Sequence, residues 1–305
     1  MSEIGAPKQG LMNIGEEAKP PFAVLPDPSS LFLNRSRRLA TLAPKHELEP
    51  YLRFLSGLAR AQHDIQTDLP PPELPPLERL TQALTHGMPP ISPASIEPAE
   101  AALMAIDRLL AELARSDVPS ATAAAIQAVR ALSPAQQLDQ AVAVLKDLPP
   151  AGDLAQRVLI VAGLQVHFAR LASRLSASDL KPVADSACPT CGSAPMVSSV
   201  VGWPKAHNSR FCTCSLCGTM WNVVRVKCVL CSSTGGISYH TIEGASDAVK
   251  AETCDRCRSY VKILYQVNEP ALEPLADDVA TLGLDMLLAA EGWKRGGLNP
   301  FLMGY

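Results

Sequence analysis

Eight of the nine cysteines in the sequence form four Cys-x2-Cys pairs, and all of them follow residue 187. In chain order the pairs are Cys188 and Cys191, Cys214 and Cys217, Cys228 and Cys231, and Cys254 and Cys257. A Cys-x2-Cys turn presents two thiolates from one tight loop, and two such turns supply the four sulfurs of a tetrahedral zinc or iron site. The pattern therefore predicts two metal ions per chain.

The two halves of this cysteine array repeat each other. Positions 188, 191, 214 and 217 recur forty residues later, so both halves follow the pattern Cys-x2-Cys-x22-Cys-x2-Cys. Because a duplicated unit should contain its own complete site, the repeat favours four consecutive cysteines for each metal. The expected ligands are Cys188, Cys191, Cys214 and Cys217 at site 1, and Cys228, Cys231, Cys254 and Cys257 at site 2. Cross-braced and nested pairings of the four turns are the alternatives.

Cys212, the ninth cysteine, lies two residues before an expected ligand. In the second half the aligned residue is Glu252, which cannot share a thiolate role. Side chains at alternate positions of an extended segment share a face, so Cys212 would lie on the same face as Cys214. We therefore predict that Cys212 is a spare thiol near the metal that does not bind it.

The residue after the second cysteine of each pair differs between the halves. It is Gly192 or Gly218 in the first half, where glycine permits the left-handed backbone that directs amides toward sulfur. Ser232 and Arg258 occupy the same positions in the second half. This difference predicts turns in the second half that are less relaxed or differently hydrogen-bonded.

The compartment in which the cysteines reside decides whether they bind metal or form disulfides. The N-terminal "MSEIGAPKQG" has no basic region followed by an apolar run, so no secretory signal is expected. The longest apolar-rich stretch, residues 158–172, includes Gln165, His167 and Arg170 and is too short and polar to span a bilayer. We therefore expect a cytoplasmic protein without membrane insertion, in which paired cysteines bind metal.

The elements that position the cysteines change character near residue 183. Earlier segments have apolar residues at helical spacing, and the stretch 157–175 is apolar on most faces, as in a central buried helix. Later segments are short β-like runs between the cysteine pairs, followed by a helix near residues 275–292. The expected fold is α+β and multidomain, with an N-terminal all-α helical domain and two tandem rubredoxin-like or zinc-ribbon modules. The expected divisions are a proline-rich, partly disordered N-terminus at 1–29, the helical domain at 30–182, four-cysteine modules at 183–225 and 226–270, and a C-terminal helix and tail at 271–305.

Charge and motifs exclude several classes of function. The net charge is −3, and residues 181–305 contain as many acidic as basic side chains, so the basic excess of a nucleic-acid binder is missing. The sequence has no nucleotide-binding glycine loop and no nucleophile motif, and we expect no enzymatic activity. The basic cluster "NRSRRLA" at residues 34–40 predicts the start of an amphipathic helix with a solvated face, which is a candidate contact for an acidic partner.

Several segments taken together resemble the FdhE family of formate dehydrogenase accessory proteins. They are "LFLNRSRRLATLA", "CPTCGSAP", "CSLCGTMWNVVRVKCVLC", "AVKAETCDRCRSYVKILYQ", "ADDVATLGLDMLLAAEGW" and "NPFLM". The resemblance implies a cytoplasmic maturation factor for respiratory, molybdenum-dependent formate dehydrogenases that binds their catalytic subunit before export. It also implies rubredoxin-like metal positions associated with iron, which favours iron over zinc at both sites. The oligomeric state is not indicated.

Three functions therefore compete. The first is a binding protein whose metal sites support the surface that contacts the catalytic subunit. The second is a rubredoxin-like one-electron carrier or redox sensor, because iron held by four thiolates cycles between two oxidation states. The third is a tandem zinc-ribbon protein that binds nucleic acid, which the balanced charge disfavours.

Overall fold

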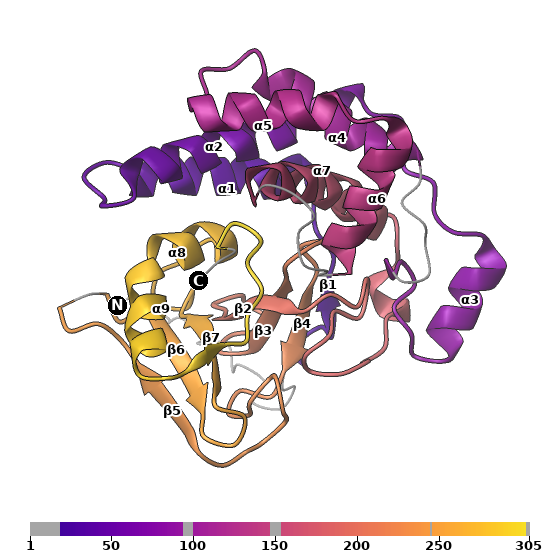
Figure 1. Ribbon diagram of the computed structural model, residues 1–305. Helices are drawn as coiled ribbons and strands as arrows, with labels where there is room; N and C mark the ends of the chain where they lie inside the picture. The colour runs from indigo at the N-terminus through magenta and orange to yellow at the C-terminus, as the bar shows by residue number, and fades with distance from the viewer. Residues whose placement is uncertain (1–18, 94–99, 147–153, 245, 303–305) are drawn as a thin grey trace, which may run out of the picture.

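Helices form one layer of the molecule, and a sheet with two further helices forms the other (Figure 1). The computed structural model describes residues 19–93, 100–146, 154–244 and 246–302. None of the helices within these ranges is long and apolar enough to cross a membrane. The arrangement agrees with the predicted combination of an N-terminal helical region and a later region of strands.

The helical layer is built around α7, which is buried along most of its length, as the sequence predicts. α7 contacts α4, α5 and α6. At Gly163 a Cβ atom would lie 2.7 Å from the Cα of Ile106, so glycine is needed for the close approach of α7 to α4. The helices of this region are α1 Pro28–Leu42, α2 Glu49–Asp64, α3 Leu77–Thr85, α4 Glu100–Leu113, α5 Ser120–Arg130, α6 Pro134–Leu145 and α7 Leu154–Ala172, with short 3-10 turns at Ile65–Asp68 and Ala177–Asp179. α3 lies to one side of the others (Figure 1).

Each cysteine repeat contributes a three-stranded antiparallel unit, and the two units share one sheet. The order along the sheet is β1-β4-β3-β2-β7-β6-β5, with β8 beside β7. The junction is the parallel pairing of β2 with β7, where Ser198 lies opposite Ile263. The strands are β1 Ala23–Val24, β2 Pro195–Val200, β3 Arg210–Cys214, β4 Met220–Val223, β5 Ile237–His240, β6 Val249–Cys254, β7 Ser259–Leu264 and β8 Lys294–Arg295. The tandem modules are therefore joined by backbone hydrogen bonds, which satisfy the strand edges that each would otherwise expose.

The expectation of a partly disordered segment at 1–29 falls on two different parts of the chain. Residues 1–18 lie outside the described residues. Ala23 and Val24 form β1 and pair with β4, so this part of the segment extends the sheet. Asp27 then caps α1, because its carboxylate accepts a hydrogen bond from the backbone N–H of Ser29.

The predicted solvated basic face at residues 34–40 is wrong for two of its three arginines. Arg35 is buried and lies 3.4 Å from the carboxylate of Glu273. Arg38 forms ion pairs with Asp277 at 2.7 Å and with Glu269 at 2.8 Å. These carboxylates belong to a segment more than two hundred residues later, so α1 uses its arginines to hold the C-terminal region against the helical layer.

The C-terminal region contains two helices, and the single helix expected near 275–292 is a wrong prediction. α8 Pro274–Ala280 and α9 Leu282–Ala290 are separated at Thr281. The ammonium group of Lys262 donates hydrogen bonds to the backbone carbonyls of Asp278 and Thr281, at 2.7 and 3.1 Å. The two carbonyls thus accept hydrogen bonds from a side chain and do not need the backbone hydrogen bonds of a continuous helix. This accounts for the break between α8 and α9. Beyond α9, Phe301 and Leu302 are buried, so this part of the apolar tail packs on the fold.

Candidate metal centres

The first four-cysteine cluster brings together the side chains predicted for site 1. The Sγ atoms of Cys188, Cys191, Cys214 and Cys217 all lie within 4.8 Å of one another. The distance between Sγ atoms is 3.7 Å for Cys188 and Cys217 and 3.4 Å for Cys191 and Cys214. Four sulfurs placed about 2.3 Å from a central ion form a tetrahedron with edges of about 3.8 Å. The donors therefore fit a tetrahedral ion of the size of zinc or iron.

The second cluster repeats this geometry forty residues later. Cys228, Cys231, Cys254 and Cys257 also place all their Sγ atoms within 4.8 Å of one another. The distance between Sγ atoms is 3.8 Å for Cys228 and Cys257 and 3.7 Å for Cys231 and Cys254. The sequential grouping is thus the one that the fold assembles, and neither the cross-braced nor the nested grouping is brought together among the described residues. The role of the eight thiolates as metal ligands stays a prediction.

All four turns adopt the left-handed backbone that their spacing requires. The φ angles are 82° at Gly192, 76° at Gly218, 61° at Ser232 and 54° at Arg258. The N–H of Gly192 donates to the carbonyl of Cys188 at 2.8 Å, and that of Ser232 donates to the carbonyl of Cys228 at 2.9 Å. The turns at these two positions therefore share one hydrogen bond, and the turn at Arg258 has its counterpart, from the N–H of Arg258 to the carbonyl of Cys254 at 2.9 Å. The expectation of less relaxed turns in the second half is the alternative that agrees with the φ angles. What differs is the steric cost, about 1–2 kcal/mol for a residue with a Cβ in this region.

Comparison with known proteins places the whole array in one family. The model described as "FdhE, N-terminal" matches residues 20–185, "FdhE, central domain" matches 187–225, and "FdhE, C-terminal domain" matches 226–302. The chain belongs to the FdhE family. This confirms the resemblance found in the sequence, and it includes both four-cysteine clusters.

Individual FdhE proteins match along nearly their full length. A protein FdhE homolog of Rhizobium meliloti strain 1021 is 40% identical, with 96% of each chain covered. Protein FdhE of Escherichia coli O127:H6 is 33% identical over 92% of this chain and 91% of its own. The crystal structure of the FdhE protein from Pseudomonas aeruginosa has a TM-score of 0.82 and 33% identity, and it covers 93% of this chain and 99% of that one.

The first cluster of this FdhE family member is enclosed by the helical layer. All four of its cysteines are at most 2% exposed. A Cβ at Gly192 would lie 3.2 Å from Pro89, and one at Gly218 would lie 3.0 Å from Leu31, so the helical region packs directly on both turns. The amide of Gln165, in α7, donates to the carbonyl of Ser215 inside the second turn at 2.8 Å. Cluster 1 is therefore part of the contact between the helices and the sheet.

The second cluster lies at the surface. Cys231 is exposed and Cys257 is half-buried, whereas Cys228 and Cys254 are buried. The C-terminal segment covers one side, where a Cβ at Gly296 would overlap the side chain of Leu230.

Both clusters contain thiols whose pKa is raised and one whose pKa is lowered. Burial raises the pKa of Cys214 and Cys217 well above their usual value in cluster 1, and it raises that of Cys228 to about 12 in cluster 2. At Cys191 burial is outweighed by hydrogen bonds from the other cysteines of cluster 1, which lower its pKa, and the backbone N–H of Ser233 lowers that of Cys231. Binding of a cation as thiolates must therefore release protons from both clusters.

We expect the two ions to leave at different rates when a chelator is added to the zinc-loaded protein. Cluster 2 should lose its ion about tenfold faster or more, because opening cluster 1 requires the helical layer to separate from the sheet. The release of zinc to a coloured chelator should show two phases of equal amplitude. A Cys231→Ser variant should lack the fast phase, and a single phase for the unchanged protein would contradict the assignment.

Cys212 is separate from both clusters. It is fully buried in β3, where it pairs in register with Ser198 on one side and Trp221 on the other. Burial raises its pKa to about 12. Its sulfur is not among the four that converge at cluster 1, which agrees with the predicted spare thiol.

Sequence analysis missed a set of buried charges that hold the sheet together. Arg210 of β3 and Glu252 of β6 form a two-bond ion pair with side chains that are 0% and 3% exposed. On β7, Lys262 pairs with Asp278 and Asp285 of the C-terminal helices. The available signal was a charged residue inside an otherwise apolar strand, as in "SYVKIL". A charged residue remains buried only when it is paired with an opposite charge. The local sequence does not indicate which residue supplies that charge.

Proposed function

We propose that this protein is a cytoplasmic accessory protein that is required for the maturation of a respiratory molybdenum formate dehydrogenase. In this proposal it binds the catalytic subunit before export and catalyses no reaction itself. The observation that carries the proposal is the FdhE family match, which extends across the helical region and both four-cysteine units. The relatives named FdhE match over more than nine-tenths of this chain.

We propose that the eight paired cysteines hold two metal ions, with iron favoured and zinc as the alternative. Either ion cross-links the turns to which it is bound, and iron in addition supplies one-electron chemistry. The turns carry the ends of short strands that could not hold a core of their own. In this role, cluster 1 fixes the sheet against the helical layer, and cluster 2 orders the surface formed by the second repeat.

The binding function is tested by co-purification. The tagged protein, expressed anaerobically together with the formate dehydrogenase catalytic subunit, should retain that subunit on an affinity column, whereas an unrelated tagged rubredoxin should not. Cells that lack the chromosomal copy should regain formate dehydrogenase activity when this chain is supplied. The proposal fails if the subunit is abundant in the lysate and is not retained.

The exposure of Cys231 supports a second candidate, electron transfer through cluster 2. An exposed thiolate ligand shortens the path from the metal to a redox partner. Purification without oxygen, followed by metal analysis and a visible spectrum, separates the two candidates. A colourless protein with two zinc ions per chain would exclude the electron carrier and leave the binding role intact.

A further inference from the structure

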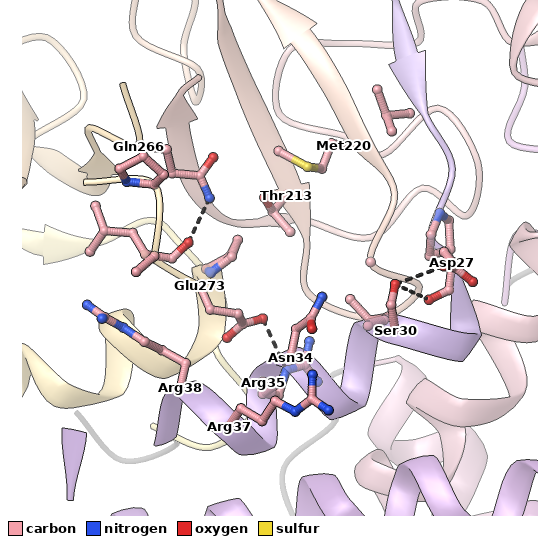
Figure 2. Close-up of a pocket in the computed structure, with 18 of the residues that line it drawn as sticks. Asp27, Ser30, Asn34, Arg35, Arg37, Arg38, Thr213, Met220, Gln266 and Glu273 are labelled. Carbon is pink, nitrogen blue, oxygen red and sulfur yellow. Dashed lines mark hydrogen bonds and ion pairs between the residues drawn. The ribbon is translucent and has the colours of Figure 1, made fainter. Parts of the chain in front are cut away.

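A cavity of about 670 Å³ lies between α1 and the sheet, beside cluster 1. Its walls come from residues 24–41, the strands β3 and β4 with their connecting turn, residues 266–274, and Trp203 in the loop between β2 and β3. Figure 2 shows Thr213 and Met220 on the strand side and the side chains of α1 facing them. Cavities of this size between two layers of a fold are common ligand sites.

The cavity has a buried polar group without a partner. Thr213 is 4% exposed, and its Oγ1 has no hydrogen-bond partner among the described residues. A buried hydroxyl in this state costs free energy unless a ligand or water satisfies it. Because Thr213 lines the cavity, a ligand or water bound there is in a position to supply the missing partner.

Two side-chain amides near Thr213 supply both donors and acceptors. Gln266 donates its Nε2 hydrogen to the carbonyl of Leu272 at 2.8 Å, which leaves its Oε1 as an acceptor. Asn34 is exposed on α1, and Figure 2 places its amide between the helix and Thr213. A small inorganic anion needs donors alone, whereas a peptide backbone alternates N–H with C=O. The mixed set favours a peptide.

The charges at the cavity favour an acidic ligand. Arg35 is paired with Glu273, and Arg38 with Asp277 and Glu269. Arg37 also lines the cavity, is exposed, and has no ion pair within the part of the chain that the structure describes. The carboxylate of Asp27 is engaged by the first turn of α1. The guanidinium of Arg37 is therefore available to bind a carboxylate through two parallel hydrogen bonds.

Much of the remaining wall is apolar. The apolar lining includes Val24, Leu31, Trp203, Met220 and Leu272. A ligand that fills the cavity must therefore present an apolar side chain toward these residues and an anionic one toward the rim at Arg37.

We propose that this cavity binds an extended peptide segment of the catalytic subunit in which an acidic side chain adjoins an apolar one. This inference rests on the proposed function and adds the place and chemistry of the contact. The apolar side chain packs against Trp203 and Met220, the backbone bonds to Thr213 and Gln266, and the carboxylate pairs with Arg37. Since Thr213 precedes Cys214, cluster 1 holds the floor of the cavity in position.

The test is photo-crosslinking in the full-length protein. A p-benzoylphenylalanine at position 34 replaces Asn34 at the rim, and the same group at position 127 replaces the exposed Gln127 on α5 as a control. In the co-purified complex, the position-34 probe should join the catalytic subunit and the position-127 probe should not. Mass spectrometry should locate the bond in a segment that contains an aspartate or glutamate beside an apolar residue.

A charge reversal provides a second, independent measurement. Arg37→Glu should raise the dissociation constant for the catalytic subunit about tenfold or more, the loss expected for one charge-assisted contact. Arg108→Glu, at an exposed position on α4, is the matched control and should leave the constant unchanged. Both variants should keep the circular dichroism and metal content of the unchanged protein.

The outcomes distinguish this inference from the proposed function. If the unchanged protein retains the subunit but neither the position-34 probe nor Arg37→Glu has an effect, the cavity assignment is overturned and the binding function stands. A crosslinked segment without an acidic residue also overturns the assignment. If the unchanged protein fails to retain the subunit at all, both proposals are refuted together.

Discussion

Replacing Cys214 with serine is expected to remove one of two metal ions per chain and to destabilise the sheet severely. Cys214 is buried in cluster 1 between the strands and the helical layer. A structural zinc ion contributes about 10–16 kcal/mol in small domains, which is as large as the whole stability of a typical protein, about 5–15 kcal/mol. We therefore expect the variant to be largely unfolded around β2, β3 and β4. Metal analysis after anaerobic purification and a urea titration followed by circular dichroism measure the two effects.

Two further serine substitutions serve as controls for this result. Cys212→Ser should retain both ions and lose about 1–3 kcal/mol, the cost of burying a hydroxyl where a thiol packed. Cys254→Ser, at the equivalent position of the second repeat, should also lose one ion. Its loss of stability should be smaller than that of Cys214→Ser, because Cys231 and Cys257 of cluster 2 reach the surface, whereas all four cysteines of cluster 1 are buried. Two ions in Cys214→Ser, or one in Cys212→Ser, would refute the assignment of ligands.

The cysteine groups could be predicted from the sequence because their spacing repeats. A turn that places two thiolates together is a local feature, and a duplication copies the complete set. The same holds for α7, whose apolar residues on most faces indicate burial without reference to any partner. Local patterns were sufficient wherever the deciding interaction lay within a few residues.

The junction of the two repeats could not be predicted in this way. β2 and β7 pair through backbone groups, which every residue carries, so the side chains of Ser198 and Ile263 do not specify each other. The break between α8 and α9 depends on Lys262, which reaches the helix from a strand. The partners of Arg35 and Arg38 are likewise separated from them by more than two hundred residues. In each case the deciding contact is tertiary.

The buried pair between Arg210 and Glu252 allows the contribution of one such contact to be measured. The two guanidinium nitrogens lie 2.8 and 2.9 Å from the two carboxylate oxygens. Arg210 also donates to the hydroxyl of Ser198 on β2. Because Glu252 lies on β6, the ion pair connects the first repeat to the second. Tyr239 of β5 donates to the same carboxylate at 3.0 Å. Removal of the negative charge would leave the guanidinium buried and uncompensated.

We expect Glu252→Gln to lower the free energy of unfolding by about 3–5 kcal/mol, the usual result of breaking a buried ion pair from one side. The double variant Arg210→Met with Glu252→Leu should recover part of this loss, since it removes both charges, although the carbonyls of Arg225 and Lys227 then lose their donor. Urea titrations of the metal-loaded Arg210→Met and Glu252→Leu single variants, together with the double variant, complete the thermodynamic cycle.

Arg60→Ala is the matched surface control. It removes an ion pair of similar length, 2.8 Å to Asp64, in which both side chains are exposed. Solvent screening should make its effect on unfolding small. If Glu252→Gln were as mild as Arg60→Ala, the pair would not be what fixes the second repeat against the first, and the parallel hydrogen bonds between β2 and β7 would have to hold that junction without it.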